Sequence, residues 1–201
     1  DQYFVSYTVT DTIEEKIPKK IQEKTTVGID LGLKHFLVMS DGVRIENPKF
    51  LKQSEQRLAV LQRRLSRKVK GSQNKKKARK QVAKVYLKIK NQRSDWLHKL
   101  THQLTRENQA ESYAMETLRV QNMMKNHCLA KAIADASWGE FVRQMEYKCR
   151  WYGKNLIRIG TFEPSSKMCL CGAVNQSLTL AVREWTCQSC QRVNDRDLTA
   201  A

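Results

Sequence analysis

The stretch Val27-Gly28-Ile29-Asp30-Leu31-Gly32 decides the fold. Its apolar residues, Val27 to Ile29, are typical of a strand buried inside a sheet, and Asp30 stands where that strand ends. Burying an ionised carboxylate at the end of a central strand costs free energy unless a cation binds to it and to other ligands. The stretch therefore predicts a buried first strand that carries a functional carboxylate at its end.

Other segments of the chain also favour strands. Asp41-Gly42 lies between two β-rich runs and favours a tight turn that joins antiparallel strands. Because strands flank a long helical region, we expect an α/β fold, a mixed sheet covered by helices. The further segments predicted as strands are 3–9, 36–39, 43–45, 112–116 and 156–159.

Between residues 48 and 104 the hydrophobic period changes to that of a helix. Apolar residues recur every three or four positions in two stripes, which the Gly71-Ser72-Gln73-Asn74 break separates. We therefore expect two long amphipathic helices that form a hairpin, inserted at 48–105 into a core that spans 25–160. A further single helix is expected over 126–152.

This helical hairpin carries a dense positive charge. Fourteen Lys and Arg residues lie between Arg63 and Arg93, and no acid interrupts them. Such a surface repels itself unless phosphates supply the counter-charge, so we expect it to contact a nucleic-acid backbone. The alternative is a solvated basic surface without a ligand. The residues assigned to this interface are Arg63, Arg64, Arg67, Lys68, Lys70, Lys75, Lys76, Lys77, Arg79, Lys80, Lys84 and Lys88.

The composition of the whole chain agrees with a nucleic-acid partner. Its 201 residues include 37 Lys and Arg against 20 Asp and Glu, which gives a formal net charge of +17. Such a balance indicates a polyanionic partner. No apolar run approaches the ~20 residues that a membrane helix needs, and the first residues lack the pattern of a signal peptide. The sequence therefore disfavours membrane proteins and secreted proteins.

Four cysteines form two pairs near the end of the sequence. Cys169 and Cys171 form a C-x-C pair, and Cys187 and Cys190 form a C-x-x-C pair after fifteen residues. In a chain without an export signal, such pairs favour a metal over disulfides, and the gap suits a hairpin around one tetrahedral zinc. The short first pair leaves reactive or inert thiols as the alternative. We expect a zinc-ribbon module at 161–193.

Two further acids are placed like Asp30. Glu116 ends another predicted strand, and Asp197 lies in the predicted final helix, 194–201, for which Asp195 suits the N-cap. Because the chain contains twenty acids, the presence of three is no evidence of a site. The evidence is that these acids lie at the ends of predicted strands and in a predicted helix. Oxygen ligands on rigid elements suit Mg²⁺ or Mn²⁺, and two such ions about 4 Å apart can promote phosphodiester hydrolysis.

Together these motifs resemble the TnpB family, RNA-guided endonucleases of bacterial insertion sequences that are related to the type V CRISPR effectors. The resemblance rests on residues 27–32, on Met115-Glu116-Thr117-Leu118, and on Asp195-Arg196-Asp197 after the cysteine pairs. It covers nearly the whole chain from about Tyr3. Further stretches that agree with the family, in the right order, are 70–72, 91–93, 120–123 and 164–167.

The resemblance implies a RuvC-like nuclease domain of the RNase H fold, with a zinc ribbon inserted before the last acid. In this family three acids hold two Mg or Mn ions, and they match Asp30, Glu116 and Asp197 as catalytic residues. The sequence departs from the family at Thr199, where the family has Asn, and at the contracted pair Cys169-Leu-Cys171. The first departure bears on the position of the last acid, and the second bears on the affinity for zinc.

The resemblance also implies a guide RNA, a target DNA and a cytoplasmic, nucleoid-associated protein of a prokaryote. We expect residues 1–24 to be a remnant of an N-terminal lobe, and the chain to be a fragment that lacks guide-dependent targeting. Lys34 and Arg183 are interpreted as surface charges, with phosphate contacts as the alternative. The leading hypothesis is a Mg-dependent DNA endonuclease. The alternatives are a nuclease-inactive RNA-guided repressor, a decayed transposon-associated fragment and a cut-and-paste transposase, whose acids commonly follow the order Asp, Asp, Glu.

Overall fold

A mixed five-stranded sheet forms the centre of the molecule. The structure, a computed structural model, describes residues 5–8, 16–160, 165–179 and 182–201. β1 pairs antiparallel with β2 and parallel with β4, and β4 pairs parallel with β5. The predicted mixed α/β architecture is confirmed. The strand order is β3-β2-β1-β4-β5, with β1 (Thr26–Leu31), β2 (His35–Met39), β3 (Arg44–Glu46), β4 (Ser112–Glu116) and β5 (Asn155–Ile159).

The strands predicted within the core are confirmed to within a residue or so at each end. The turn at Asp41-Gly42 joins β2 to β3: the N–H of Met39 donates to the carbonyl of Val43 at 2.8 Å, and Gly42 has a φ of 90°. The predicted strand over 3–9 is wrong for the described residues 5–8, which form no strand; the others lie outside the described residues. Val5 is 90% exposed, so this segment buries nothing that would hold a strand in place.

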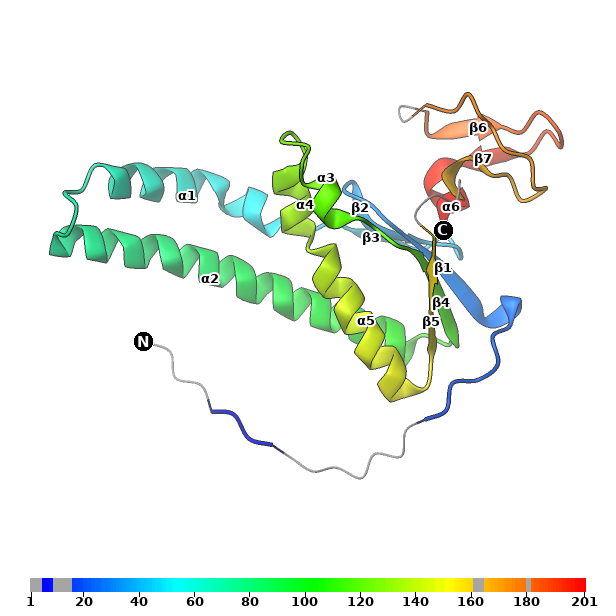
Figure 1. Cartoon of the computed structure of the whole chain (residues 1–201), viewed down its shortest axis with the longest axis horizontal. Helices are drawn as coiled ribbons and strands as arrows, with labels where there is room; N and C mark the ends of the chain where they lie inside the picture. The colour runs from blue at the N-terminus through cyan, green and yellow to red at the C-terminus, as the bar shows by residue number, and fades with distance from the viewer. Residues whose placement is uncertain (1–4, 9–15, 161–164, 180–181) are drawn as a thin grey trace.

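Two long helices, α1 (Phe50–Ser66) and α2 (Gln73–His102), form the predicted hairpin, which extends away from the sheet (Figure 1). The hydroxyl of Ser72 accepts a hydrogen bond from the N–H of Lys75 and so caps the start of α2. A narrow apolar seam holds the two helices together, and its buried residues are Leu58, Val82, Val85 and Ile89. Within the described ranges, no helix has the length and apolar character to cross a membrane.

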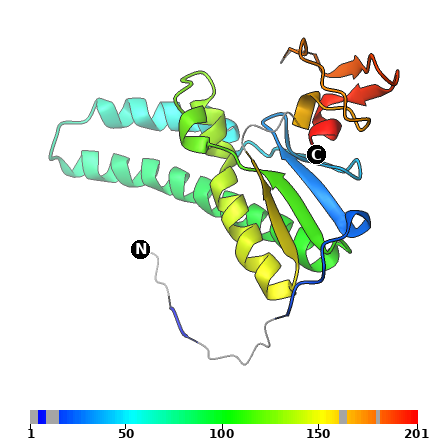
Figure 2. The ribbon, with the colours of Figure 1, turned by 45° about the vertical axis from the view of Figure 1, so that its right-hand side comes forward.

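One face of the sheet is covered by α5 (Trp138–Tyr152) and by the end of α2, which lie together in Figures 1 and 2. The core lies between these layers. The ring of Phe36 meets those of Trp96 and Phe141 edge-on, at centroid distances of 4.7 and 5.3 Å. Tyr113 is fully buried and donates its hydroxyl to the carbonyl of Leu104.

The single helix predicted over 126–152 is wrong, because the chain turns at Ser137. This residue has a left-handed conformation, with φ 55°, and separates α4 (Ala130–Ala136) from α5. Ile133 and Trp138 are 1% and 2% exposed. In an unbroken helix, five positions would place these side chains about 140° apart, too far to face one core. The break allows both to be buried.

The opposite face of the sheet receives the end of the chain. β6 (Glu184–Thr186) and β7 (Val193–Asp195) form a two-stranded sheet, and α6 (Arg196–Ala200) follows and contacts β1 and β2. Gly28 permits this contact, since a Cβ there would lie 1.4 Å from the carbonyl oxygen of Ala201. Gly28 alternates along β1 with Val27 and Ile29, which pack in the helix-covered core, so α6 lies on the other face.

Candidate functional site

Asp30 and Glu116 lie at the ends of two neighbouring parallel strands. The paired register of β1 and β4 reaches Ile29 and Met115, and the two acids are the next residue on each strand. Ile29 and Met115 are buried in the helix-covered core. Because side chains alternate along a strand, both acids project from the opposite face, where α6 lies.

Asp197 reaches the same place from the far end of the sequence. It lies in the first turn of α6, which contacts β1. A cavity of about 270 Å³, which we call the acidic cavity, is lined by Asp30 and Asp197 together with Lys34, His35 and Arg183, among other residues. The structure therefore brings the predicted acids of β1 and α6 to one cavity.

The first turn of α6 is fixed by its own side chains. Asp195 is the N-cap, as the sequence predicts, and its Oδ1 accepts hydrogen bonds from the N–H groups of Asp197 and Leu198, each at 3.0 Å. Thr199 donates its hydroxyl to the carbonyl of Asp195 at 2.6 Å. Thr199, the residue that departs from the family pattern, is thus hydrogen-bonded to the N-cap of its own helix.

The electrostatics of the site show that Asp30 feels the charges of the other two acids. Burial raises the pKa of Asp30 to about 6, and the negative charges of Asp197 and Glu116 raise it as well. The positive charges of Arg196 and Arg183 offset part of this effect. Burial also raises the pKa of the Glu116 carboxyl. The site therefore concentrates negative charge and favours the uptake of a proton or a cation.

The three acids do not surround a single point. Of the residues that the structure describes, only four cysteines place three or more metal-ligating atoms within 4.8 Å of one another. Asp197 has a cation of its own, since the guanidinium of Arg183 donates to its Oδ1 at 2.9 Å. Arg183, interpreted from the sequence as a surface charge, is exposed but also contacts a predicted site residue.

The predicted cysteine cluster is compact. The sulfurs of Cys169, Cys171, Cys187 and Cys190 all lie within 4.8 Å of one another. The sulfur of Cys169 lies 3.6 Å from that of Cys190, and the sulfur of Cys171 lies 3.6 Å from that of Cys187. Metal–sulfur bonds of about 2.3 Å in a regular tetrahedron place the sulfurs about 3.8 Å apart. The N–H of Cys171 is the main cause that lowers the pKa of Cys169 to about 6, which favours the thiolate. The cluster is therefore suited to hold a metal ion, even with a contracted first pair.

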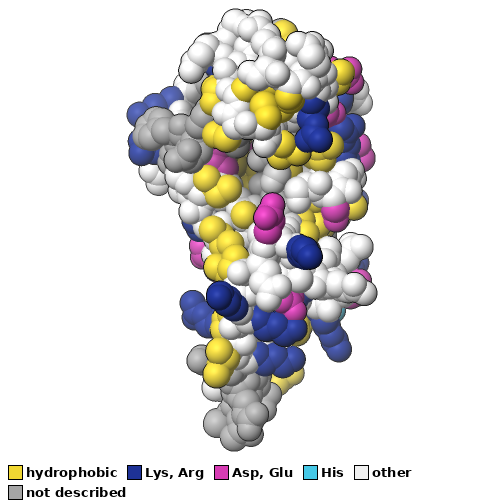
Figure 3. Space-filling model, turned by 90° about the vertical axis from the view of Figure 1, so that its right-hand side faces the viewer, with side chains coloured by type: hydrophobic (Ala, Val, Ile, Leu, Met, Phe, Trp, Pro, Cys, Tyr) yellow, Lys and Arg dark blue, Asp and Glu magenta, His cyan; other side chains and the backbone are white. Residues whose placement is uncertain are grey.

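The twelve basic residues predicted to contact nucleic acid lie along the helical hairpin. All of them are exposed except Lys75, which is half-buried. Within the described part of the chain, none of the twelve forms an ion pair. The face of the molecule seen in Figure 3, by contrast, mixes basic and acidic side chains. These twelve residues thus form a basic arm whose charges have no acidic partner within the described residues.

Asp135 is a buried acid whose role sequence reasoning missed. Its side chain is 8% exposed, it accepts a hydrogen bond from Arg93 at 2.7 Å, and both of its oxygens accept from the N–H of Leu51, at 3.0 and 3.1 Å. It therefore joins α4 to the start of α1, at Leu51, and to α2, at Arg93. Arg93 closes the basic run in the sequence, yet it is a structural cation at the base of the arm.

The arrangement of the elements matches solved structures of Cas12f1. A structure titled "Cryo-EM structure of the Cas12f1-sgRNA-target DNA complex" matches with a TM-score of 0.64 and 17% identity, and covers 91% of this chain and 50% of that one. Another, "Cryo-EM structure of CRISPR-Cas12f Ternary Complex", matches with a TM-score of 0.66 and 19% identity, and covers 92% and 39%. These likenesses establish the fold class.

The sequence places the chain in a family. The model of OrfB_IS605, described as a probable transposase, matches residues 4–127, and that of the Cas12f1-like TNB domain matches residues 138–201. The first match spans more than half of the chain, so the chain belongs to the OrfB_IS605 family. The resemblance to the TnpB family is thereby confirmed.

Curated relatives carry related names. A "Putative RNA-guided DNA endonuclease" of Streptomyces pristinaespiralis is 47% identical over 201 residues, which are 100% of this chain and 48% of the relative. "Putative RNA-guided DNA endonuclease InsQ" of Escherichia coli (strain K12) is 30% identical over 190 residues, 87% of this chain and 47% of the relative. The chain spans about half the length of the curated relatives it matches.

Proposed function

We propose that this chain is the nuclease part of an RNA-guided DNA endonuclease with a RuvC-like site. Asp30, Glu116 and Asp197 are its catalytic residues and hold two divalent cations, Mg²⁺ or Mn²⁺. The observation that carries the proposal is that Asp30 and Asp197 line one cavity, and that the pKa of Asp30 is raised by burial and by the negative charges of Asp197 and Glu116. The names of the relatives support the same reaction.

The three acids fit this chemistry. Carboxylate oxygens are the ligands that hard divalent cations prefer, and two of the three acids stand on adjacent strands that cannot shift independently. Bound cations would supply the charge that activates a water and stabilises the leaving oxygen of a phosphodiester. Arg183 holds Asp197 and places a further positive charge beside the cavity, where it would attract the phosphate.

The decisive experiment uses the full-length reading frame together with its flanking transcript as the guide. Plasmid cleavage with Mg²⁺ is expected in the wild type, and Asp30→Ala should lower the rate by at least about a thousandfold. Asp41→Asn is the matched control, because this acid lies in the β2–β3 turn and an amide oxygen can still accept the N–H of Val43. Guided binding without any cut would favour the nuclease-inactive repressor instead.

We further propose that the four cysteines hold one structural zinc ion. The sulfur spacing supports this, and a four-thiolate site leaves no open position for catalysis. The ion would fix the β6–β7 hairpin, and through it α6 and Asp197. Cys187→Ser should lower the zinc content from one ion per chain toward zero, whereas Cys128→Ser, an exposed cysteine outside the cluster, should leave it unchanged. Equal zinc content in both variants would contradict this assignment.

The basic arm is proposed to hold the guide RNA–target DNA duplex through its phosphates. Lys76, Lys80 and Lys84 follow one another at a spacing of four residues and therefore share one side of α2. Changing the three to Gln should lower the slope of log affinity against log salt by roughly 0.7–0.9 for each phosphate that is no longer neutralised. Lys99→Gln is the control, since Lys99 already pairs with Asp95. An unchanged slope would show that these lysines do not contact the phosphates of the nucleic acid.

A further inference from the structure

Arg44 forms an ion pair with the end of the chain. From β3, its guanidinium donates to Oδ2 of Asp195 at 2.6 Å, across 151 positions of the sequence. Among the ion pairs between described residues, it alone joins the part of the chain up to residue 160 to the part from 165 onward. The two side chains are 44% and 32% exposed, so the pair should contribute little to the free energy of unfolding. What the pair can determine is the placement of α6, which begins after Asp195.

Arg44 stands in one row with Asp30 across three strands. Asp30 is paired with Val38 on β2, and Val38 is paired with Arg44 on β3. Residues that are paired across antiparallel strands project from the same face of a sheet, so Arg44 shares the face of Asp30, where α6 lies. Two strand spacings, about 10 Å, separate the backbones of Arg44 and Asp30. The sheet therefore fixes where this guanidinium stands relative to the first acid of the site.

The two oxygens of the Asp195 carboxylate have different partners. Oδ1 accepts hydrogen bonds from the N–H groups of Asp197 and Leu198 and so caps the start of α6. Oδ2 accepts from the guanidinium of Arg44. Because both oxygens belong to one planar group, a cation held at Oδ2 also fixes the direction in which Oδ1 meets the helix. Arg44 thus orients the first turn of α6, which contains Asp197.

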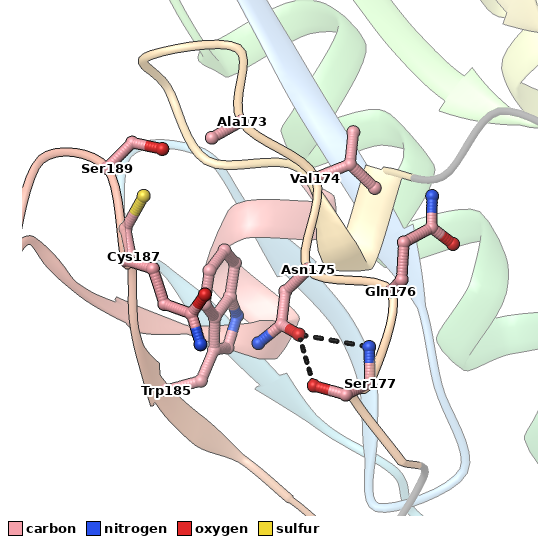
Figure 4. A pocket seen from close by; sticks show the side chains of 9 residues that line it. Ala173, Val174, Asn175, Gln176, Ser177, Trp185, Cys187 and Ser189 are labelled. Atoms are coloured by element: carbon pink, nitrogen blue, oxygen red, sulfur yellow. Dashed lines mark hydrogen bonds between the residues drawn. The ribbon is translucent and has the colours of Figure 1, made fainter.

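The cysteine module that precedes α6 is packed around residues of its own. Its cavity of about 310 Å³ (Figure 4) is lined, among the described residues, by 173–177, 185 and 187–189 alone. Its buried cluster likewise contains no residue of the five-stranded sheet. The members of this cluster are Cys169, Leu178, Trp185 and Cys187. The position of α6 on the sheet therefore depends on contacts outside this interior, and the pair of Arg44 with Asp195 is one of them.

Asp197 is placed near an acid that repels it. Burial, and then the negative charge of Asp197, raise the pKa of Asp30, so the two carboxylates repel each other when both are ionised. Cations bound between them would remove this repulsion. Without such cations, an attraction between α6 and the sheet has to offset it, and the charge of Arg44 acts on Asp195, two residues before Asp197.

We propose that Arg44 is a positioning residue of the acidic site, an inference that rests on the proposed nuclease function. By holding Asp195, it keeps the first turn of α6 on the sheet, so that Asp197 stands near Asp30 before a cation arrives. A site that is arranged in advance binds its ligand more tightly, because the apparent affinity falls with the fraction of molecules in the competent arrangement. Arg44 therefore lowers the concentration of divalent cation that the site needs.

The first test follows guided cleavage by the full-length protein as Mg²⁺ is varied. Arg44→Met should raise the Mg²⁺ concentration that gives half of the maximal rate about fivefold, and saturating Mg²⁺ should restore the wild-type kcat. KM for the target DNA should stay unchanged, and Arg44→Lys, which keeps the charge, should recover most of the loss. Arg158→Met is the matched control, because Arg158 lies on the other edge strand and pairs with Glu146 on α5. A raised KM with an unchanged Mg²⁺ requirement would overturn the inference and assign Arg44 to a phosphate of the DNA.

A double substitution tests whether Arg44 acts through Asp195. Asp195→Asn keeps one oxygen that can cap α6 but replaces the anionic oxygen at Arg44 by an NH₂ group, so it should also raise the Mg²⁺ requirement. In this background Arg44→Met should have no further effect, since the interaction that it removes is already lost. If the effects of the two substitutions multiply instead, Arg44 acts by another route and the inference is wrong.

Hydrogen exchange in the metal-free protein tests the placement of α6 without any cleavage. Mass spectrometry of the peptide that contains residues 196–201 should show exchange about fivefold faster in Arg44→Met than in the wild type, with an unchanged midpoint of thermal unfolding. Arg158→Met should exchange this peptide at the wild-type rate. Equal exchange in all three proteins would overturn the inference. If the wild type does not cut DNA at all, the proposed nuclease function fails, while the exchange rate still decides whether Arg44 holds α6.

Discussion

Asp135, at the base of the hairpin, and Asp30, in the acidic cavity, meet opposite surroundings. Asp135 contacts the guanidinium of Arg93 and the N–H of Leu51, so its charge is fully matched. Asp30 is different: burial, and then the like charges of Asp197 and Glu116, raise its pKa to about 6. The difference teaches that the acid which supports the fold is paired directly with positive groups, whereas the surroundings of Asp30, the acid proposed to hold a cation, favour the uptake of a proton or a cation.

Removal of the Asp135 charge should have the largest effect. Asp135→Asn leaves Arg93 without its anion in a mostly buried site and should lower the free energy of unfolding by about 3 kcal/mol. Urea titration measures this quantity. Asp95→Asn is the control, because its ion pair with Lys99 is exposed and should contribute less than about 0.5 kcal/mol. If the two variants were equally stable, the contrast drawn above would be wrong.

The same substitution at Asp30 should act in the opposite direction. Without divalent cations at pH 7, Asp30→Asn should raise the free energy of unfolding by roughly 2 kcal/mol, because it removes an ionised carboxylate that folding disfavours. Cleavage should be lost in the same variant. A more stable and inactive protein would identify a site whose charge is kept at a cost to the fold; a destabilised variant would contradict the raised pKa.

The stability difference between the wild type and Asp30→Asn should depend on pH. Asp30 titrates near pH 6 when folded and near 3.8 when unfolded, so the folded state holds the proton more tightly. The protonated carboxyl is accommodated below about pH 4, and its advantage is lost as the pH rises through 6. The difference should therefore be near zero at pH 4 and reach its full value above pH 6. Millimolar Mg²⁺ at pH 7 should stabilise the wild type alone.

Arg183→Met should have the smallest effect. The positive charge of Arg183 lowers the pKa of Asp30, so its removal should move the midpoint of this pH profile upward. The free energy of unfolding at pH 7 should change by at most about 1 kcal/mol, because the arginine side chain is largely exposed. Lys34→Met, in the same cavity, is the control for a general loss of positive charge. A midpoint that moves downward would contradict the assignment.

The parts of the site that local patterns encode could be predicted from the sequence. The apolar run before Asp30 and the strand before Glu116 have the period and composition of buried strands, and the structure places both acids at the strand ends. The spacing of the cysteine pairs likewise predicted a cluster, and the sulfurs do lie together. Each strand signal lies within a few consecutive residues, and the cysteine signal lies between residues 169 and 190.

The contacts that could not be predicted join residues that are distant in the sequence. Arg93 meets Asp135 and Arg44 meets Asp195, at 2.7 and 2.6 Å, and no period or spacing connects either pair. The helix break at Ser137 could not be predicted for a related reason: it depends on the burial of Trp138 in the core. Tertiary packing decides these features, and a helical pattern alone continues through them.

A substitution at Gly28 would change the position of Asp197 without changing any of the three acids. The carbonyl of Ala201 already fills the space that a side chain at this position would need. One added methyl group would therefore push the last helix off the first strand and carry Asp197 with it, while every ligand atom stayed in the chain. A residue without a side chain thus determines whether α6 can pack on β1 and bring Asp197 close to Asp30.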